Sequence, residues 1–256
     1  MRLNRFFTKR ENLTIGSSIL LEEEDTTHIK KVLRLSKGDK IIIFNGEKEF
    51  LAELTLVSKD AVVASIESLL RQEDFSGENR VEITLIQGLL RSGKFDFIVE
   101  KATEIGVDYI VPLEAEYSQM KADAAGKKLE RWNKLALSAS KQSERIRIPE
   151  ITTPIKFSEI SKIVDEFDKV YLLTIDRDSL KEISEVKPLS KDVNTKLKHV
   201  AVVIGPEGGF SPAEHKLAKE FGFEFVSIGK TILRAETASI VALGIVNFLY
   251  NNESNS

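Results

Sequence analysis

The chain has 256 residues, 42% of them hydrophobic and 30% charged, and its net charge at neutral pH is −3. This is the composition of a globular protein of one or two domains, and it excludes collagen-like and wholly disordered chains. With no cysteine, three scattered histidines and no long apolar run, the sequence predicts no disulfide, no metal site, no membrane segment and a cytoplasmic location.

Short runs rich in β-branched residues dominate the first part of the chain. Four of them are predicted strands: 19–21, 40–44, 50–57 and 61–66. A short helix is predicted at 26–35 between the first two strands. Turn signals such as Asn45-Gly46 separate the runs. These elements predict a small β-barrel domain over residues 1–72, followed by a polar linker at 73–80.

After the linker, strands alternate with helices. The predicted strands are 81–87, 109–113, 169–175, 199–204 and 224–228, and the predicted helices are 94–105, 129–143, 157–167, 212–221 and 236–250. Alternation of this kind is typical of an α/β domain with a parallel sheet covered on both faces. We assign this domain to residues 81–250 and expect the polar tail 251–256 to be disordered.

Positive charge is concentrated in two segments of an otherwise acidic chain. Residues 28–40 carry five cations against one carboxylate, and residues 127–147 carry seven against two. Solvated helix faces are the plain explanation for any one such run. Two separate runs favour an anionic partner, because arginine and lysine suit phosphate and base-edge contacts.

One segment resembles a phosphate-binding loop, but it lacks an essential group. Gly88 to Lys94 has nearly the required spacing and lies between a strand and a helix. The motif needs a hydroxyl after the lysine to hold Mg²⁺, and Phe95 stands there instead. A nucleotide hydrolase is therefore the less favoured alternative, and a plain strand–helix turn is the simpler interpretation.

Two glycine-containing turns follow predicted strands and precede predicted helices. In the first, Gly205-Pro206-Glu207-Gly208-Gly209 leads to Ser211 and Pro212, a helix cap with Glu214 completing a capping box. In the second, Gly229 is followed by Ile232, Leu233, Arg234 and Glu236. The carboxyl ends of parallel strands are where open α/β sheets bind ligands, and glycine lets a ligand approach the backbone. Tight turns and capped helices without any ligand remain the alternative.

Taken together, these segments resemble the RsmE family of the SPOUT class of methyltransferases. The resemblance rests on the following residues in chain order: His28, Val32 to Leu35, Gly38-Asp39, Gln87, Lys94, Lys101 to Val107, Arg131-Trp132, Gln142-Ser143, Arg145, Pro149-Glu150, Gly205 to Phe210, Ile232 to Arg234, and Glu236 to Ala238. It covers nearly the whole chain.

The resemblance implies a function and a fold. The family methylates N3 of one uridine in 16S, small-subunit ribosomal RNA with S-adenosylmethionine. The implied architecture is an α/β knot, with a parallel sheet and a C-terminal trefoil knot, preceded by a PUA-like β-barrel that binds RNA. A homodimer and a substrate within the assembled small subunit are also implied. The chain departs from the usual family pattern at Lys141, Lys230, Thr231 and Ala235.

Site residues follow from the motifs and the resemblance. For the reacting centre we expect Arg234 and Glu236, and the proton acceptor stays open among a carboxylate, an arginine-stabilised uracil anion and water. The expected cofactor residues are Ile204, Gly205, Glu207, Gly208, Gly209, Ile228, Gly229, Ile232, Leu233, Thr237 and Ala238. The expected RNA-binding residues are Arg5, Lys30, Lys31, Arg34, Arg91, Lys94, Gln142, Ser143, Arg145 and Arg147. A non-catalytic RNA-binding factor is the other alternative, since it would need the basic segments but not the two glycine turns.

Overall fold

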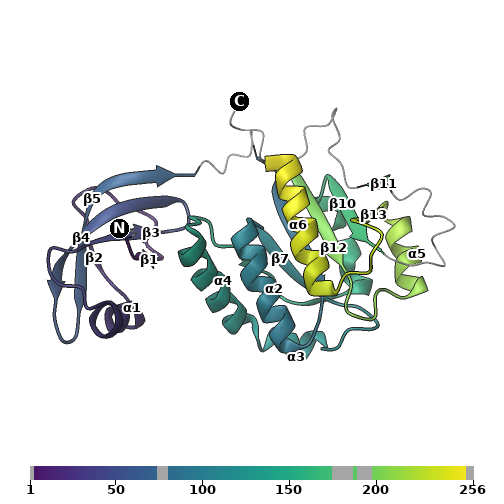
Figure 1. Ribbon diagram of the computed structural model, residues 1–256, viewed down its shortest axis with the longest axis horizontal. Coiled ribbons are helices and arrows are strands. Elements are labelled where there is room, and N and C mark those ends of the chain that lie inside the picture. Colours follow the sequence, from purple (N-terminus) through teal and green to yellow (C-terminus); the bar gives the residue numbers. More distant parts are fainter. Residues whose placement is uncertain (1–2, 74–79, 175–186, 189–197, 252–256) are drawn as a thin grey trace. The chain divides into compact units, whose positions relative to one another are not determined.

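A computed structural model of the protein describes residues 3–73, 80–174, 187–188 and 198–251 (Figure 1). The chain divides into two compact units, residues 1–75 with 140–148 and residues 76–139 with 149–256. Most of the predicted linker and of the predicted tail lies outside the described residues, so the domain boundaries stay predictions. Within the described ranges, no helix has the length and apolar character needed to cross a membrane.

The first unit is built on a five-stranded sheet in the order β1-β3-β4-β5-β2. Its elements are β1 (Arg5–Phe7), β2 (Ser18–Leu20), α1 (Glu23–His28), the π-helical turn η1 (Ile29–Leu33), β3 (Lys40–Phe44), β4 (Lys48–Val57) and β5 (Val62–Gln72). All pairs are antiparallel except β1 with β3. The sequence analysis predicted four of these strands and missed β1, whose three residues are too few to show a period.

Alternation along the strands of this unit creates its core. Ile41 and Ile43 of β3, Leu54 of β4 and Ala64 of β5 are fully buried on one side of the sheet. The β3–β4 turn is held by Asn45, whose Oδ1 accepts hydrogen bonds from the backbone N–H groups of Glu47, in the turn, and Lys48, the first residue of β4. The Asn-Gly turn signal is thus confirmed.

The helix predicted at 26–35 is shorter and less regular than expected. The helical segment starts three residues earlier, at Glu23, and its last part widens into η1. Ile29 is fully buried in the core, whereas Lys31 is exposed. Arg34 then ends the segment in a left-handed conformation with φ of 55°.

The second unit contains an eight-stranded sheet in which every strand pair is parallel. The order is β11-β13-β10-β12-β6-β7-β8, and β9 also pairs with β7. The strands are β6 (Glu82–Gly88), β7 (Tyr109–Glu114), β8 (Glu150–Ile151), β9 (Ile155–Lys156), β10 (Lys169–Leu173), β11 (Lys187–Pro188), β12 (His199–Ile204) and β13 (Glu224–Ser227). The α/β class and the parallel sheet are confirmed. The trefoil knot is consistent with this strand order and stays a prediction.

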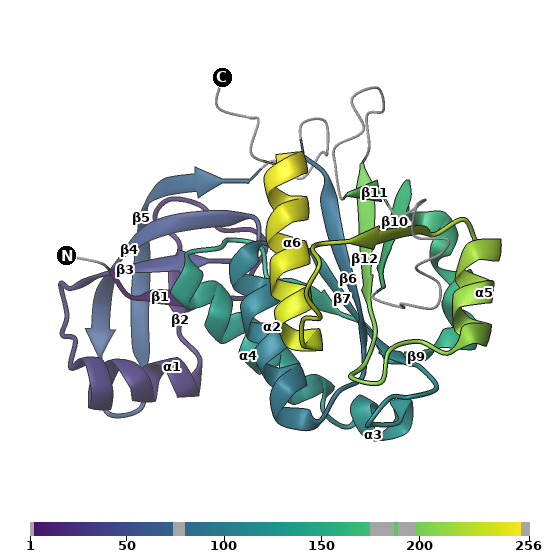
Figure 2. The same cartoon turned by 45° about the vertical axis from the view of Figure 1, so that its right-hand side comes forward.

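Helical segments cover both faces of this sheet (Figure 2). They are α2 (Ser92–Ile105), α3 (Ala122–Gly126), α4 (Leu129–Ser143), η2 (Phe157–Lys162), η3 (Val164–Glu166), α5 (Pro212–Glu220) and α6 (Ala235–Asn251). On one face, α2 and α6 lie side by side, and the hydroxyls of Tyr171 in β10 and Tyr250 in α6 are 2.6 Å apart. On the other, Val170 and Leu172 pack with η2 and α5 in one apolar cluster.

The prediction of an α-helix at 157–167 is wrong. The structure has two short 3₁₀ segments there, η2 and η3. Phe157 and Ile160 are the buried residues of η2, and their spacing of three matches the period of a 3₁₀-helix. The carboxylate of Glu159 also accepts a hydrogen bond from the backbone N–H of Lys156 and closes the first turn.

Candidate active site

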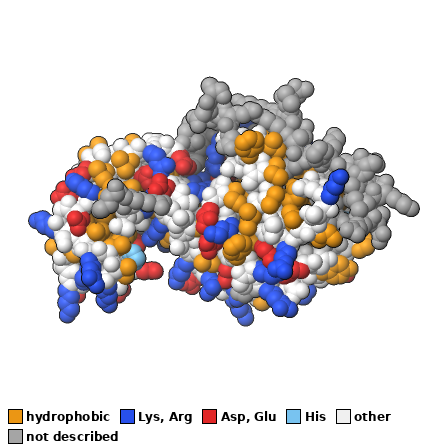
Figure 3. Space-filling view, in the orientation of Figure 1, with side chains coloured by type: hydrophobic (Ala, Val, Ile, Leu, Met, Phe, Trp, Pro, Cys, Tyr) orange, Lys and Arg blue, Asp and Glu red, His pale blue; other side chains and the backbone are white. Residues whose placement is uncertain are grey.

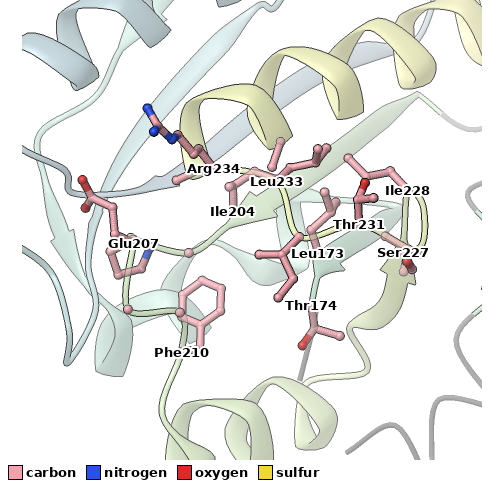
Figure 4. A pocket seen from close by; sticks show the side chains of 18 of the residues that line it. Leu173, Thr174, Ile204, Glu207, Phe210, Ser227, Ile228, Thr231, Leu233 and Arg234 are labelled. Carbon is pink, nitrogen blue, oxygen red and sulfur yellow. The ribbon is translucent and has the colours of Figure 1, made fainter. Parts of the chain in front are cut away.

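A cavity of about 880 Å³ lies at the carboxyl ends of β10, β12 and β13 (Figure 4). Small-molecule sites have volumes in this range, and this edge of a parallel sheet is where open α/β folds bind ligands. The apolar part of the wall comes from strand ends and from the loop before α6: Leu173, Ile204, Val226, Ile228 and Leu233. The cavity is thus formed by the two turns that the sequence singled out.

The turn after β12 brings backbone to the cavity because its glycines allow a tight path. Gly209 has a φ of +72°, and its N–H donates to the carbonyl of Pro206 at 2.9 Å. A Cβ on Gly205 would lie 3.3 Å from the Cα of Gly209 and 3.3 Å from the ring of Phe210. The turn therefore closes on itself too tightly for larger residues.

The same turn is anchored by the start of α5. Ser211 accepts a hydrogen bond from the N–H of Glu214, and the Glu214 carboxylate accepts one from the N–H of Ser211. Pro212 is the first residue of the helix. The predicted capping box is confirmed, and it fixes where the glycine turn ends.

Gly208 lines the cavity and also packs closely against a second loop. A Cβ on Gly208 would lie 2.7 Å from the Cβ of Tyr117, in the loop after β7. This close approach between two loops already requires a glycine at position 208, and the expectation that Gly208 binds the cofactor stays a prediction.

The turn after β13 supplies the other wall. Gly229 has a φ of +155°, and nothing lies within 4 Å of the place where its Cβ would be. The Ser227 hydroxyl lies 3.0 Å from the Gly229 carbonyl oxygen and bridges the turn. Ile232 also lines the cavity, but it is 62% exposed and so lies at its rim.

The start of α6 is held over the sheet by a buried polar contact. The Ser239 hydroxyl lies 2.5 Å from Oε1 of Gln87, the residue before the end of β6, and both residues are fully buried. Gln87 also donates from its amide to the carbonyl of Gly88. A Cβ on Gly88 would lie 2.4 Å from the backbone nitrogen of Pro206, so β6 and the glycine turn are in direct contact.

Charged groups gather at one end of the cavity. Glu207 and Arg234 lie at the same end in Figure 4, away from Ile228 and Thr231. Lys94 at the start of α2 also lines the cavity, and its ammonium lies 3.1 Å from Glu207. The hydrogen bond with Glu207 raises the pKa of Lys94 above its usual value, so the lysine is charged at neutral pH.

Most of the residues expected at the cofactor site line this cavity. They are Ile204, Gly205, Glu207, Gly208, Gly209, Ile228, Gly229, Ile232, Leu233 and Ala238. Thr237 does not line it and is exposed on α6. Of the two residues expected at the reacting centre, Arg234 lines the cavity. Glu236 does not line it, and its Oε1 lies 3.5 Å from the ammonium of Lys94.

Several lining residues were not singled out from the sequence. Leu173 ends β10 and Thr174 follows it; the strand was predicted but carries no motif. His215 lies one turn into α5, where its ring packs beside Phe210 and its Nε2 is 3.4 Å from the Thr174 hydroxyl. The pairing of β10 with β12 and β13 brings Leu173 and Thr174 to the site. The part of the chain that the structure describes contains no cluster of three or more metal-ligating side chains.

Arg5 is not on the surface where an RNA contact would need it. Its side chain is 3% exposed and forms an ion pair with Glu49 at 2.6 Å. Its Nη1 donates to the carbonyl of Ser140 and its Nη2 to that of Arg145. The guanidinium also lies over the ring of Phe44. Its donors are therefore occupied inside the first unit, which overturns the expectation that it binds RNA.

The other expected RNA-binding residues lie at or near the surface. Lys31, Arg34, Arg91 and Gln142 are exposed, and Lys30, Lys94, Ser143, Arg145 and Arg147 are half-buried. The structure groups Ser143, Arg145 and Arg147 with the first unit, because residues 140–148 pack there. No local sequence signal indicates this packing.

The near phosphate-binding loop has an ordinary structural role. Phe95 is fully buried in α2 and packs on Trp132 of α4, with ring centroids 4.3 Å apart. The indole N–H of Trp132 donates to Asp96. The position where a phosphate-binding loop needs a hydroxyl is thus part of the apolar core.

Comparisons with known proteins agree on one family. A model of an RNA methyltransferase domain matches residues 77–247, and a model of an RNA methyltransferase PUA domain matches residues 21–67. Ribosomal RNA small subunit methyltransferase E of Aquifex aeolicus is 33% identical over 241 residues, 92% of this chain and 95% of the relative. The protein of that name from Bacillus subtilis is 29% identical over 254 residues, 96% of each chain.

Solved structures give the same result. A ribosomal RNA small subunit methyltransferase E from Neisseria gonorrhoeae bound to S-adenosylmethionine matches with a TM-score of 0.81 and 30% identity, over 97% of this chain and 98% of that one. A methyltransferase from Legionella pneumophila in complex with the same cofactor matches with a TM-score of 0.79 and 30% identity, over 96% and 98% of the two chains.

Proposed function

The chain belongs to the ribosomal RNA small subunit methyltransferase E family, and from this premise we propose which atom it methylates and how. It is an S-adenosylmethionine-dependent ribosomal RNA methyltransferase. We propose N3 of one uridine in 16S ribosomal RNA as the acceptor, within the assembled small subunit in the cytoplasm. The observation that carries this proposal is the cavity between two glycine turns, with its cationic and acidic groups at one end.

The cavity suits S-adenosylmethionine in size and in chemistry. Apolar side chains such as Leu173 and Ile228 can pack on a flat purine ring, and Ser227 and Thr231 offer hydroxyls. The open space at Gly229 leaves its backbone accessible to the edge of a ligand. When bound, the cofactor supplies an activated methyl group on a sulfonium.

The protein's part in the reaction is alignment and control of charge. Holding donor and acceptor in one orientation can remove roughly 7–11 kcal/mol from a barrier. Arg234 and Lys94, at the charged end of the cavity, can stabilise negative charge that develops on the acceptor base. Glu236 lies beside them through its contact with Lys94.

We propose that the first unit and the basic loop packed on it bind the RNA. Lys30, Lys31 and Arg34 lie on or next to η1, and Arg145 and Arg147 lie on the segment 140–148. A PUA domain of RNA methyltransferases matches this part of the chain, which supports the assignment. Gln142, Ser143, Arg91 and Lys94 complete the proposed contact set.

We also propose that the protein is a homodimer that pairs through α6. One side of this helix packs on the sheet, with Leu243 and Val246 buried. On the opposite side, Val241 is 37% exposed and Phe248 is 66% exposed. Figure 3 shows hydrophobic side chains at the surface in the region of α6, and apolar side chains on an exposed helix face are typical of an interface. Light scattering at micromolar concentration should give twice the monomer mass, and Phe248→Asp should shift it towards the monomer.

The reaction can be tested with purified protein and RNA from a strain that lacks this enzyme. We expect calorimetric binding of S-adenosylmethionine but not of ATP, and transfer of labelled methyl to small subunits. An N3 methyl group blocks Watson–Crick pairing, so reverse transcription should stop at one uridine. Cofactor-independent RNA binding without methyl transfer would instead favour a non-catalytic RNA-binding factor. Binding of ATP with Mg²⁺ would favour a nucleotide hydrolase.

A further inference from the structure

Three charged side chains are in contact where α2 and α6 begin: Lys94 and Glu207 line the cavity, and Glu236 lies next to Lys94. The Lys94 ammonium lies 3.1 Å from Glu207 and 3.5 Å from Oε1 of Glu236. Glu207 belongs to the glycine turn, and Glu236 is the second residue of α6. The lysine thus bridges two carboxylates that come from segments 29 residues apart in the sequence.

The second oxygen of Glu236 has no partner. Among the described residues, its Oε2 and the hydroxyl of Ser140 are the buried side-chain polar atoms that lack a hydrogen bond. A buried carboxylate oxygen without a donor is costly, and each such group calls for an explanation, such as a catalytic role or a bound water. Stabilising the helix N-terminus would explain a glutamate here, but not an oxygen that is both buried and unbonded. The arrangement points to a donor that arrives with the substrate.

We propose that Glu236 accepts the N3 proton of the substrate uracil, and that Lys94 and Arg234 bind the two carbonyl oxygens on either side of it. This inference rests on the proposed function. The N3–H bond of uracil breaks and its proton moves to Oε2 of Glu236. The freed N3 electron pair forms a bond to the methyl carbon, and the carbon–sulfur bond breaks with its electrons staying on sulfur. Glu236 then releases the proton to water.

The proposed set of donors and acceptor is complementary to the edge of uracil. That edge carries an acceptor, a donor and an acceptor, O2, N3–H and O4. Lys94 and Arg234 as donors and Glu236 as acceptor offer the complementary pattern of donor, acceptor and donor. Cytosine has no proton on N3 and places an amino donor where uracil has O4, so the same set would reject it. The proposed set therefore accounts for specificity as well as proton transfer.

Lys94 can move away from Glu236 and still keep its contact with Glu207. Its contact with Glu207 is the shorter of the two, and the lysine side chain is 37% exposed. A turn of the ammonium towards a uracil carbonyl would lengthen the contact with Glu236 and keep the one with Glu207. Lys94 is then a group that binds the substrate base rather than an RNA phosphate.

Other titratable side chains of the cavity are less suited to accept this proton. The histidine on the cavity wall, His215, has its Nε2 3.4 Å from Thr174, which lies away from Arg234 and Glu207 in Figure 4. Glu207 is closely paired with Lys94. Glu236, which contacts the lining residue Lys94, differs from these groups because its Oε2 is shielded and unbonded.

The decisive experiment is Glu236→Gln, which keeps the shape of the side chain and removes its basicity. We expect kcat for methyl transfer to fall about 10²–10⁴-fold, the usual contribution of a general base. Calorimetric affinity for S-adenosylmethionine and affinity for RNA should stay unchanged. Activity relative to the unmodified protein should recover as the pH rises towards the range where uracil N3 ionises by itself. A structural role for Glu236 would give no such alkaline recovery.

Glu220→Gln is the matched control, because Glu220 pairs with Lys216 on the exposed side of α5 and does not line the cavity. It should leave kcat unchanged. If Glu236→Gln binds S-adenosylmethionine normally and keeps full kcat, the proposal is overturned, while methylation by the unmodified protein still supports the proposed function. Absence of methylation by the unmodified protein would count against the function itself.

Lys94→Gln gives a second, independent test should Glu236→Gln fail to fold. We expect a lower kcat with an unchanged salt dependence of RNA binding. A phosphate contact would instead reduce the slope of log K against log salt by roughly 0.7–0.9. A reduced slope with full kcat would therefore overturn the role of Lys94 in the proposal.

Discussion

Glu49 and Glu236 are both glutamates that lie against cationic side chains, one in each compact unit. Glu49 is 3% exposed, and both of its oxygens are bonded, Oε1 to Arg5 and Oε2 to Arg71. Glu236 has one oxygen 3.5 Å from Lys94 and the other without a partner. A carboxylate whose bonds are complete holds structure together, whereas one with a free oxygen is available for chemistry.

The partners of Glu49 extend this structural role. Arg5 donates to the carbonyls of Ser140 and Arg145, and Arg71 donates to that of Glu144. One buried carboxylate thus organises two arginines that cap the end of α4 and the loop after it. This loop carries Arg145 and Arg147, so the cluster positions the proposed RNA-binding arginines.

The largest effect on stability is expected from breaking the buried cluster of Glu49, Arg5 and Arg71. Glu49→Ala leaves Arg5 buried without its counter-charge, and losing one partner of a buried ion pair typically costs about 3–5 kcal/mol. Urea unfolding should show this loss in the free energy of unfolding. Glu53→Ala, which removes an exposed partner of Lys40 in the neighbouring part of β4, should have a much smaller effect. Equal losses in the two variants would mean that burial does not distinguish Glu49.

A second variant tests whether the cavity depends on the close contact between β6 and the glycine turn. Gly88→Ala places a Cβ against the backbone of Pro206 and must displace the glycine turn that carries Glu207. Overpacking of this kind costs about 1–3 kcal/mol. We expect lower thermal stability and loss of S-adenosylmethionine binding by calorimetry. Gly93→Ala, in α2 with open space around it, is the control and should retain the cofactor. Normal binding by Gly88→Ala would show that the turn can move without harm.

A third prediction concerns two buried tyrosines, Tyr171 and Tyr250, which carry no charge at neutral pH. The hydroxyls of Tyr171 and Tyr250 are 2.6 Å apart, and burial raises the pKa of both above 10. Because the unfolded tyrosines ionise first, this stability is complete below about pH 10 and is lost as the pH rises above it. The loss is at most about 1.4 kcal/mol per pH unit for each tyrosine.

Unfolding curves between pH 8 and 11 can test this, as conditions chosen to bracket the ordinary tyrosine pKa of about 10. Tyr250→Phe should reduce the decline above pH 10. The pH at which stability begins to fall also sets the upper limit for measuring the alkaline recovery of Glu236→Gln, because activity must be measured while the protein is folded. An equally steep decline in Tyr250→Phe would show that other groups cause it.

The sequence predicted the parallel sheet and the two glycine turns because both depend on local signals. A buried strand followed by Gly205 to Gly209 and a capped helix is legible in a short window. The sequence did not predict that Leu173 and His215 line the cavity, because this depends on which strands and helices are neighbours in the fold. The period of three at Phe157 and Ile160 was too short to separate a 3₁₀-helix from an α-helix.

The partners of the charged residue Arg5 also could not be predicted from local sequence. An arginine near the N-terminus of an RNA-binding domain suggests a phosphate contact, and nothing in the neighbouring sequence reveals Glu49 as its partner. The two residues are 44 positions apart, and they meet because β3 pairs with both β1 and β4. Only tertiary structure separates a buried arginine from one that faces solvent.

The smallest expected effect concerns cations that lack such a buried carboxylate. Lys30, Lys31 and Arg34 lie on or beside η1, and changing all three to alanine should spare the fold, in contrast to Glu49→Ala. If these side chains contact phosphates, each lost contact reduces the slope of log K against log salt by roughly 0.7–0.9, because fewer counterions are released on binding. RNA binding measured at several salt concentrations gives this slope, with Lys216→Ala on α5 as a control at an 81% exposed lysine. Affinity for S-adenosylmethionine should stay unchanged, since the cavity belongs to the second unit. An unaltered slope in the triple variant would leave the loop held by Arg5 and Glu49 as the RNA-binding part of the first unit.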